Sequence, residues 1–350
     1  MATGIVSIAF EMMDFSCVAR LLFALNLLLY LILFVILVAR AVFFLPKLVA
    51  DLKTLQRAFP FLTFVVGTNI VGTQLILFCQ LTELAVLLWF LAVVSWLVGV
   101  YFLLLNLSVI QTKPGILENI NGTTLLIVVS TVSISILGVH LLDVTDSHAD
   151  HLYFVLMGLW LLGFILYWII IAPLFHGLFF SRFESKDWCA PYWICMGAAA
   201  IITLAGSAFI TRMPDLSVWE GIREAILCMT VFIWSVGTLW IPYLLIMDAR
   251  KFMYMGSEVS VPLWIKIVPW SRLAFGRRHH TYEISSWSRV FPMGMYMTST
   301  LHLASATDFL SLAAIPQFWG WFALLMWSLT FIGMLRSVVF AFSHSEKSCQ

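Results

Sequence analysis

The sequence predicts an all-α integral membrane protein, and three observations support this prediction. The 350-residue chain is 62% hydrophobic and only 11% charged, whereas a soluble domain carries about 25% charged residues. Its apolar residues form long runs that short polar segments separate. Most of these runs reach about 20 residues, the length that crosses roughly 30 Å of hydrocarbon. We therefore expect a single transmembrane domain over residues 1–350, in contact with a lipid bilayer.

Ten apolar segments are expected to form helices. They cover residues 1–13, 18–44, 60–79, 83–110, 124–142, 152–178, 191–210, 222–247, 285–306 and 316–341. Each boundary between consecutive segments contains at least one polar residue, in chain order Asp14, Lys47, Gln80, Lys113, Asp143, Arg182, Asp215, Asp248 and Asp308. A loop of about 248–284 and a tail of 342–350 complete the chain.

The first segment is shorter than the others. Residues 1–13 would rise only about 20 Å as a helix, which is too short to cross the hydrocarbon. The segment also lacks the charged start and the small-residue cleavage site of a signal peptide. We therefore expect the first helix to be truncated at its N-terminus.

The distribution of charge predicts the orientation in a cell membrane, plasma or inner. With ten helices, 16 of the 19 Lys and Arg residues fall on the side that carries both termini, and only Arg20, Arg212 and Arg223 fall on the other. Short cytoplasmic loops are enriched in Lys and Arg. Both termini, the loop 248–284 and the tail are therefore expected to be cytoplasmic.

The composition argues against several kinds of site. A formal net charge of +1 leaves no basic arm for nucleic acid. The six cysteines are scattered without a Cys-x-x-Cys spacing, which predicts neither a metal site nor a disulfide framework. No cofactor motif and no catalytic constellation of His with Glu or Ser is found within the spans, so we do not expect an enzyme.

Small and hydroxyl residues alternate with bulky ones from helix to helix. The odd-numbered helices are rich in Gly, Ser and Thr, whereas the even-numbered helices are mainly aliphatic and aromatic. Tight helix packing is the ordinary role of a small residue in a membrane helix. Its repetition over five hairpins predicts an inner ring of five helices within an outer ring of five. The predicted pore-lining residues are Thr3, Gly4, Ser7, Asn69, Thr73, Thr131, Ser135, Gly197, Thr203, Gly206, Ser207, Gly294 and Thr298.

Three stretches carry a resemblance to a known family. Residues 1–7 (MATGIVS), residues 190–206 (APYWICMGAAAIITLAG) and residues 287–296 (WSRVFPMGMY) resemble the tellurite-resistance/C4-dicarboxylate transporter family. That family includes plant slow anion channels, bacterial tellurite-resistance proteins, malate permeases and sulfite exporters. The resemblance implies ten helices in five hairpins with quasi-fivefold arrangement, an anion pathway in each protomer, and a homotrimer.

The resemblance also implies a gate. In channel members of the family, the Phe of a Phe-Pro pair on the ninth helix closes the pore, and that pair is Phe291 and Pro292 here. Pro292 removes a backbone hydrogen-bond donor and kinks the helix, so the neighbouring side chain can leave the regular helical face. A narrow apolar constriction dewets and blocks a hydrated ion.

The residues themselves leave the substrate and the mechanism open. The middles of the odd-numbered helices carry no Asp, Glu or Lys, and the positive cytoplasmic side favours anions. A channel-like pathway for small inorganic anions is the first hypothesis, and a proton-coupled dicarboxylate permease or a sulfite or tellurite exporter is the second.

Four ionisable side chains bear on this choice. His140, His176 and His302 lie within or near spans, where an ionisable group is a functional candidate. Exposure at a membrane interface is the simpler interpretation of His140 and His302, because both lie near the outer ends of their helices. Arg289 is expected either to attract anions near the inner mouth or to anchor its helix.

Overall fold

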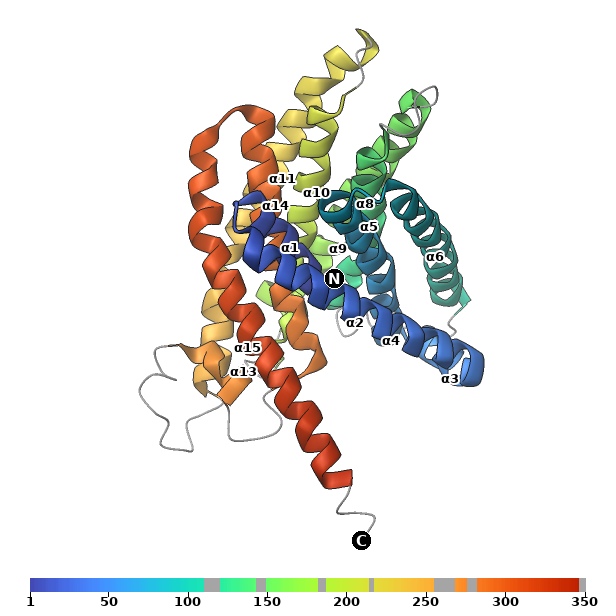
Figure 1. The fold of residues 1–350 in the computed structure, drawn as a ribbon, viewed down its shortest axis with the longest axis vertical. Helices are drawn as coiled ribbons and strands as arrows, with labels where there is room; N and C mark the ends of the chain where they lie inside the picture. Colours follow the sequence, from blue (N-terminus) through green and yellow to red (C-terminus); the bar gives the residue numbers. More distant parts are fainter. Residues whose placement is uncertain are drawn as a thin grey trace.

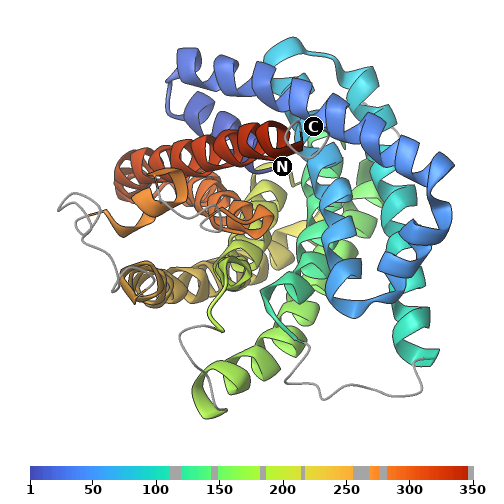
Figure 2. The same ribbon diagram turned by 90° about the horizontal axis from the view of Figure 1, so that it is seen from below.

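The computed structural model describes residues 1–109, 120–142, 149–181, 187–213, 217–254, 268–275 and 282–345. These residues form helices, and no strand occurs among them. Figures 1 and 2 show long helices gathered into one bundle, with the C-terminal helix extending beyond it. The described part of the chain is therefore all-helical, as expected.

Five antiparallel helix pairs make up the bundle. They are α1 (Ala2–Met12) with α2 (Ser16–Phe43), α5 (Thr63–Cys79) with α6 (Thr82–Val109), α8 (Leu126–His140) with α9 (Ala149–Phe180), α10 (Ile194–Thr211) with α11 (Ser217–Tyr254), and α14 (Trp287–Thr307) with α15 (Ala314–Ser345). In each pair the second helix returns along the first, so every pair begins and ends at the same end of the bundle. The five first helices therefore run in the same direction. These ten helices lie close to the ten predicted segments.

Short helical segments precede or connect the long helices. Four first helices continue directly from a 3₁₀ turn, namely η1 (Phe59–Leu62) before α5, η2 (Gly122–Leu125) before α8, η5 (Ala190–Trp193) before α10 and η7 (Ile284–Ser286) before α14. The remaining segments are α3 (Leu45–Lys53), α4 (Leu55–Ala58), η6 (Pro269–Ser271), α13 (Arg272–Phe275) and η8 (Leu310–Ala313).

The two members of each pair differ in burial. Between 61% and 94% of an 18-residue stretch is buried in α5, α8 and α10 taken with the 3₁₀ turns before them, against 11% to 39% in α2, α6, α9, α11 and α15. Most residues of α1 and α14 are also buried. The second helices expose large apolar side chains such as Leu33, Leu87 and Leu239, a pattern that suits contact with lipid.

Eight helices of the described chain are long and apolar enough to cross a membrane. The other two of the ten paired helices are α1 and α14. Helix α1 is shorter, and the 21 residues of α14 include Arg289 and several hydroxyl side chains. The chain is thus a multi-pass membrane protein. One boundary differs from the prediction, because α11 continues past residue 247 to Tyr254 and so includes Asp248, which we expected in the following loop.

The five buried helices contact one another in a cycle. Helix α1 contacts α5, α5 contacts α8, α8 contacts α10, α10 contacts α14, and α14 contacts α1. Figure 2 shows the same bundle seen along its long axis.

Side-chain hydrogen bonds follow the same order. Each exposed helix uses a Tyr or Trp to bond the buried helix of the next pair, and the last bonds the first. The pairs are Tyr30 with Thr68, Trp96 with Thr131, Trp160 with Ile202, Trp234 with Thr300, and Trp327 with Thr3, at 2.9–3.1 Å. Since lipid offers no hydrogen-bond partner, buried polar groups must find partners within the protein. These bonds join consecutive pairs around the whole bundle.

Candidate functional site

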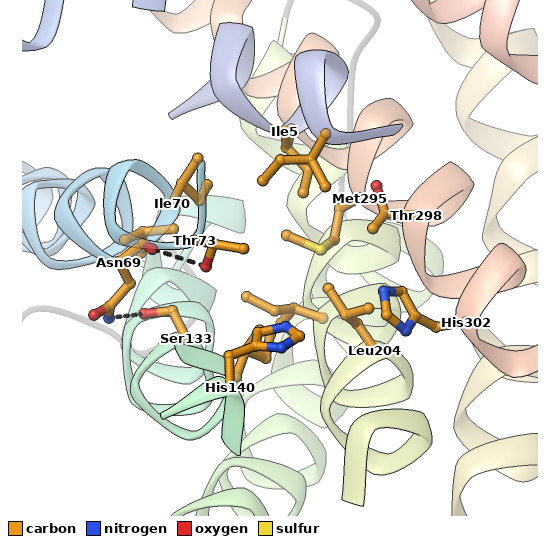
Figure 3. A pocket seen from close by; sticks show the side chains of 14 residues that line it. Ile5, Asn69, Ile70, Thr73, Ser133, His140, Leu204, Met295, Thr298 and His302 are labelled. Atoms are coloured by element: carbon orange, nitrogen blue, oxygen red, sulfur yellow. Dashed lines mark hydrogen bonds between the residues drawn. The ribbon is translucent and has the colours of Figure 1, made fainter. Parts of the chain in front are cut away.

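All five buried helices line one cavity of about 40 Å³. Its wall is mainly apolar, with Ile5, Ile70 and Leu204 among the side chains that Figure 3 shows turned towards it. The polar lining comes from Asn69, Thr73, Ser133, His140, Thr298 and His302. No Asp, Glu, Lys or Arg of the described chain lines the cavity. One water needs at least about 10–15 Å³, so the cavity is large enough to hold water.

Helix α14 presents a stripe of residues that extends from the cavity towards its own N-terminus. Met295, Thr298 and His302 line the cavity, and Phe291 precedes Met295 by four residues, or about one turn. Phe291 therefore lies on the same face of α14, one turn below the cavity lining. Its side chain is only 1% exposed, so it is enclosed among the helices.

Two glycines allow α14 to pack closely beside Phe291. A Cβ atom added to Gly197 of α10 would lie 2.8 Å from the Pro292 ring, and one added to Gly294 would lie 2.9 Å from Ile5 of α1. Both distances are below ordinary carbon contacts. The two predicted pore glycines therefore bring α10, α14 and α1 together around the Phe-Pro pair, which is a packing role.

Three of the predicted pore-lining residues line the cavity, namely Asn69, Thr73 and Thr298. The side-chain amide of Asn69 donates to Ser133 Oγ at 2.9 Å, and Thr73 Oγ1 donates to the backbone carbonyl of Asn69 at 3.0 Å. The Asn69 Oδ1 atom is buried, and no described residue donates a hydrogen bond to it.

Other predicted pore residues face a neighbouring helix. Ser7 donates to the Ala19 carbonyl of α2 at 2.8 Å, and Ser135 donates to the Leu156 carbonyl of α9 at 2.9 Å. Thr3 and Thr131 accept the Trp bonds described above. A Cβ on Gly206 would lie 2.1 Å from Thr230 of α11. The four hydroxyls bond neighbouring helices, because a hydroxyl in an apolar interior is stabilised by an immediate partner. Gly206 instead allows α11 to approach α10 closely.

The remaining three predicted residues also lie outside the cavity lining. Gly4 of α1 packs against Ile70 and Asn26, and Thr203 donates to the Ala199 carbonyl of its own helix at 2.9 Å. Ser207 Oγ is buried without a described hydrogen-bond partner. The cavity therefore includes a minority of the predicted set.

Residues outside the predicted pore-lining set complete the lining. Ser133, rather than Ser135, faces the cavity on α8, and Ile201 and Leu204 do so on α10. The imidazoles of His140 and His302 also turn towards it (Figure 3). Both histidines are partly buried. Ser133 and His140 are seven residues apart and therefore lie on one helix face. That spacing is the sequence signal from which the two could have been predicted to line the same space.

Asp248 and Arg289 form a buried ion pair at the start of α14. Arg289 Nε donates to Asp248 Oδ2 at 2.6 Å and Nη2 donates to Oδ1 at 3.2 Å. The Arg289 side chain is 4% exposed, and the Asp248 side chain is 0% exposed. The Arg289 guanidinium also lies 5.2 Å from the centre of the Phe252 ring. Arg289 therefore anchors α14, and its charge is paired rather than directed at an anion.

Three tryptophans converge on the same carboxylate. The Nε1 atoms of Trp188 and Trp193 donate to Asp248 at 2.7 and 2.9 Å, and that of Trp270 lies at 3.4 Å. Asp248 thereby connects α11 with the segment before α10, with η6 and with α14. Because Arg289 precedes Phe291 by two residues, this cluster fixes the start of the helix that carries Phe291.

The described chain provides little support for other chemistry. No group of three or more His, Cys, Asp or Glu side chains that could hold a metal ion occurs among the described residues. Beside η5, burial raises the pKa of the Cys189 thiol to about 11, so this thiol is protonated and weakly nucleophilic at neutral pH. Within the described residues, polar groups thus converge on the cavity and on Asp248.

The fold and the cavity define a multi-pass helical membrane protein with a largely neutral internal site. A family model described as a voltage-dependent anion channel, SLAC1, matches residues 1–335. The chain belongs to this family, whose members are channels and transporters, and membership supports anion transport across the membrane.

Two curated relatives are similar to part of the chain. They are the uncharacterized membrane proteins MT1776 and Rv1735c of Mycobacterium tuberculosis strains CDC 1551 / Oshkosh and ATCC 25618 / H37Rv. Each is 32% identical over 165 residues, which cover 47% of this chain and 73% of the relative.

Proposed function

We propose that this protein conducts small inorganic anions along the axis of its five buried helices, with Phe291 as the gate. In this proposal ten spans form five hairpins, with α1, α5, α8, α10 and α14 inside the other five. The observation that carries the proposal is the cavity to which all five buried helices contribute. Family membership supports an anion as the permeating species.

The location of Phe291 supports its role as the gate. Phe291 is enclosed on the same face of α14 as three cavity residues, and the Asp248–Arg289 pair anchors the turn before it. A buried aromatic ring at the end of an apolar cavity excludes water, and a dry constriction blocks a hydrated anion. Opening then requires the ring to change its rotamer or α14 to move.

The cavity lining supports conduction more than tight binding. Hydroxyl and amide groups replace part of the hydration shell of an anion without holding it by a full charge. Conduction requires binding weak enough for the ion to leave. Asn69, Thr73 and Thr298 are the predicted pore residues that we retain for this role, together with Ser133.

The size of the cavity favours small anions over dicarboxylates. A space of about 40 Å³ suits chloride or nitrate. A C4 dicarboxylate has about eight non-hydrogen atoms and needs a wider pathway. A flux panel of chloride, nitrate, sulfite and malate on the purified protein in liposomes distinguishes these substrates, and preference for malate would favour the permease hypothesis.

Phe291→Ala tests the gate. We expect the variant to raise chloride conductance well above the wild-type level in oocytes or planar bilayers, because the constriction loses its ring. Phe318→Ala is the matched control, since Phe318 of α15 is 81% exposed and lies outside the cavity lining. Unchanged conductance of Phe291→Ala at normal expression, or an equal rise in Phe318→Ala, would contradict the assignment.

The orientation and the assembly are also part of the proposal. We propose that both termini are cytoplasmic, in agreement with the charge bias, and that three copies form a homotrimer with one pathway each. Accessibility of a tag at the C-terminus in intact cells tests the orientation. Native mass spectrometry of the detergent-solubilised protein tests the oligomeric state.

A further inference from the structure

The two histidines of the cavity lie at its end away from Phe291. His140 is the last residue of α8, and His302 follows Phe291 by eleven residues, about three turns, on α14. Helix α10 contacts both α8 and α14, and its Leu204 appears between the two rings in Figure 3. Both imidazoles turn towards the same small space.

This end of the cavity is unfavourable for an anion unless a positive charge is supplied. The buried helices run in the same direction, so their C-terminal ends, including those of α8 and α14, lie towards the histidines. A helix C-terminus carries partial negative charge, which repels an anion and stabilises an imidazolium. The two imidazoles are the ionisable groups among the described lining residues.

Other charged groups lie nearby on elements packed against α8 and α14, but none of them lines the cavity. On the helices α1, α6 and α9 they are Glu11, Glu83, Asp150 and His151, and Asp14 follows α1. On α11 they are Arg223 and Glu224, while Arg212 and Asp308 follow α10 and α14. Asp143, Asp146, His148, Asp215 and the Glu220 side chain lie outside the described part of the chain.

We propose that His140 and His302, once protonated from the solution at that end, form a binding site for a small inorganic anion and make conduction increase with acidity. The inference rests on the proposed anion pathway and adds its regulation. In the neutral state the rings leave the outer end of the cavity without positive charge. In the protonated state they supply charge and N–H donors, and the bound anion in turn favours protonation.

The test measures chloride efflux from liposomes at equal internal and external pH, for the wild type and for the Phe291→Ala background. Because burial disfavours the charged imidazolium, we expect a several-fold rise between pH 7.5 and 5.5 that continues at lower pH. His140→Gln and His302→Gln should each reduce this rise, and the double variant should abolish it. His176→Gln is the matched control, because His176 is exposed on α9 and should retain the full rise.

A permanent positive charge at position 302 provides a second arm of the same experiment. His302→Lys should give a flux at pH 7.5 comparable to that of its parent at pH 5.5, with little further rise on acidification, which a purely structural histidine would not produce. His302→Asn replaces His302→Gln if the latter does not elute as a monodisperse protein.

The outcomes separate the inference from the proposed function. Chloride flux that keeps its full acid stimulation in the double variant, or flux without pH dependence, would overturn the inference while leaving the pathway in place. Absence of chloride flux at every pH in both backgrounds would overturn the proposed function itself.

Discussion

Loss of the Asp248 carboxylate should destabilise the protein more than loss of any exposed acid. In Asp248→Ala, Arg289 would stay 4% exposed without its partner, and the indole donors of Trp188 and Trp193 would lose their acceptor. Removing one member of a buried ion pair costs about 3–5 kcal/mol. An unfolding entropy of about 2.1 cal/mol/K per residue gives about 1–2 °C per kcal/mol for a chain of 350 residues. The melting temperature should therefore fall by roughly 5 °C.

The assay is thermal unfolding of the detergent-solubilised protein, followed by the loss of its monodisperse elution peak. Glu83→Gln is the matched control, because Glu83 is exposed in the first turn of α6 and contributes less than about 1 kcal/mol there. Adding Arg289→Met to Asp248→Ala should recover part of the loss, since no charge is then left unpaired in the interior.

Two results would refute this reasoning. One is a melting temperature of Asp248→Ala within about 1 °C of the wild type, below what 1 kcal/mol produces in a chain of this length. The other is a double variant that is no more stable than Asp248→Ala, because the cost would then not arise from the unpaired guanidinium.

Further variants separate packing from conduction. Gly122→Ala should lower the melting temperature, because its Cβ would lie 1.8 Å from the Pro191 carbonyl oxygen. In contrast, a Cβ on Gly67 would have no neighbouring atom within 4 Å, so Gly67→Ala should raise the free energy of unfolding by about 0.5–1 kcal/mol. The same thermal assay checks both, and equal effects would contradict the packing geometry. Thr298→Val should change chloride flux several-fold in the Phe291→Ala background, whereas Ser135→Ala should lower stability without altering flux. The reverse pattern would exchange their assigned roles.

The sequence predicted the helices well, because the length of an apolar run is set by the thickness of the membrane. The burial contrast between first and second helices also agrees with the alternation of small and bulky residues, since small side chains allow backbones to approach. Both signals are local, so they can be read without knowing which helices are neighbours.

The cavity lining was predicted less well. Helix α8 is buried on all sides, so its hydroxyl residues carry no amphipathic signal that would distinguish Ser133 from Ser135. The same limit applies to Thr131, which bonds Trp96 of a different pair. Pairing of Asp248 with Arg289, 41 residues apart, likewise depends on the tertiary arrangement, which composition and spacing do not contain.

The hydrogen bond from Trp327 to Thr3 joins residues 324 positions apart in sequence and has a consequence for biosynthesis. During synthesis, the earlier Tyr and Trp donors can meet their acceptors after one further helix pair has emerged, but Thr3 must wait for almost the entire chain. Until then the side of the first pair that later receives α15 remains open within the bilayer. Insertion of the final hairpin is therefore the step that completes the bundle, and chains interrupted before it are expected to be substrates for membrane quality control.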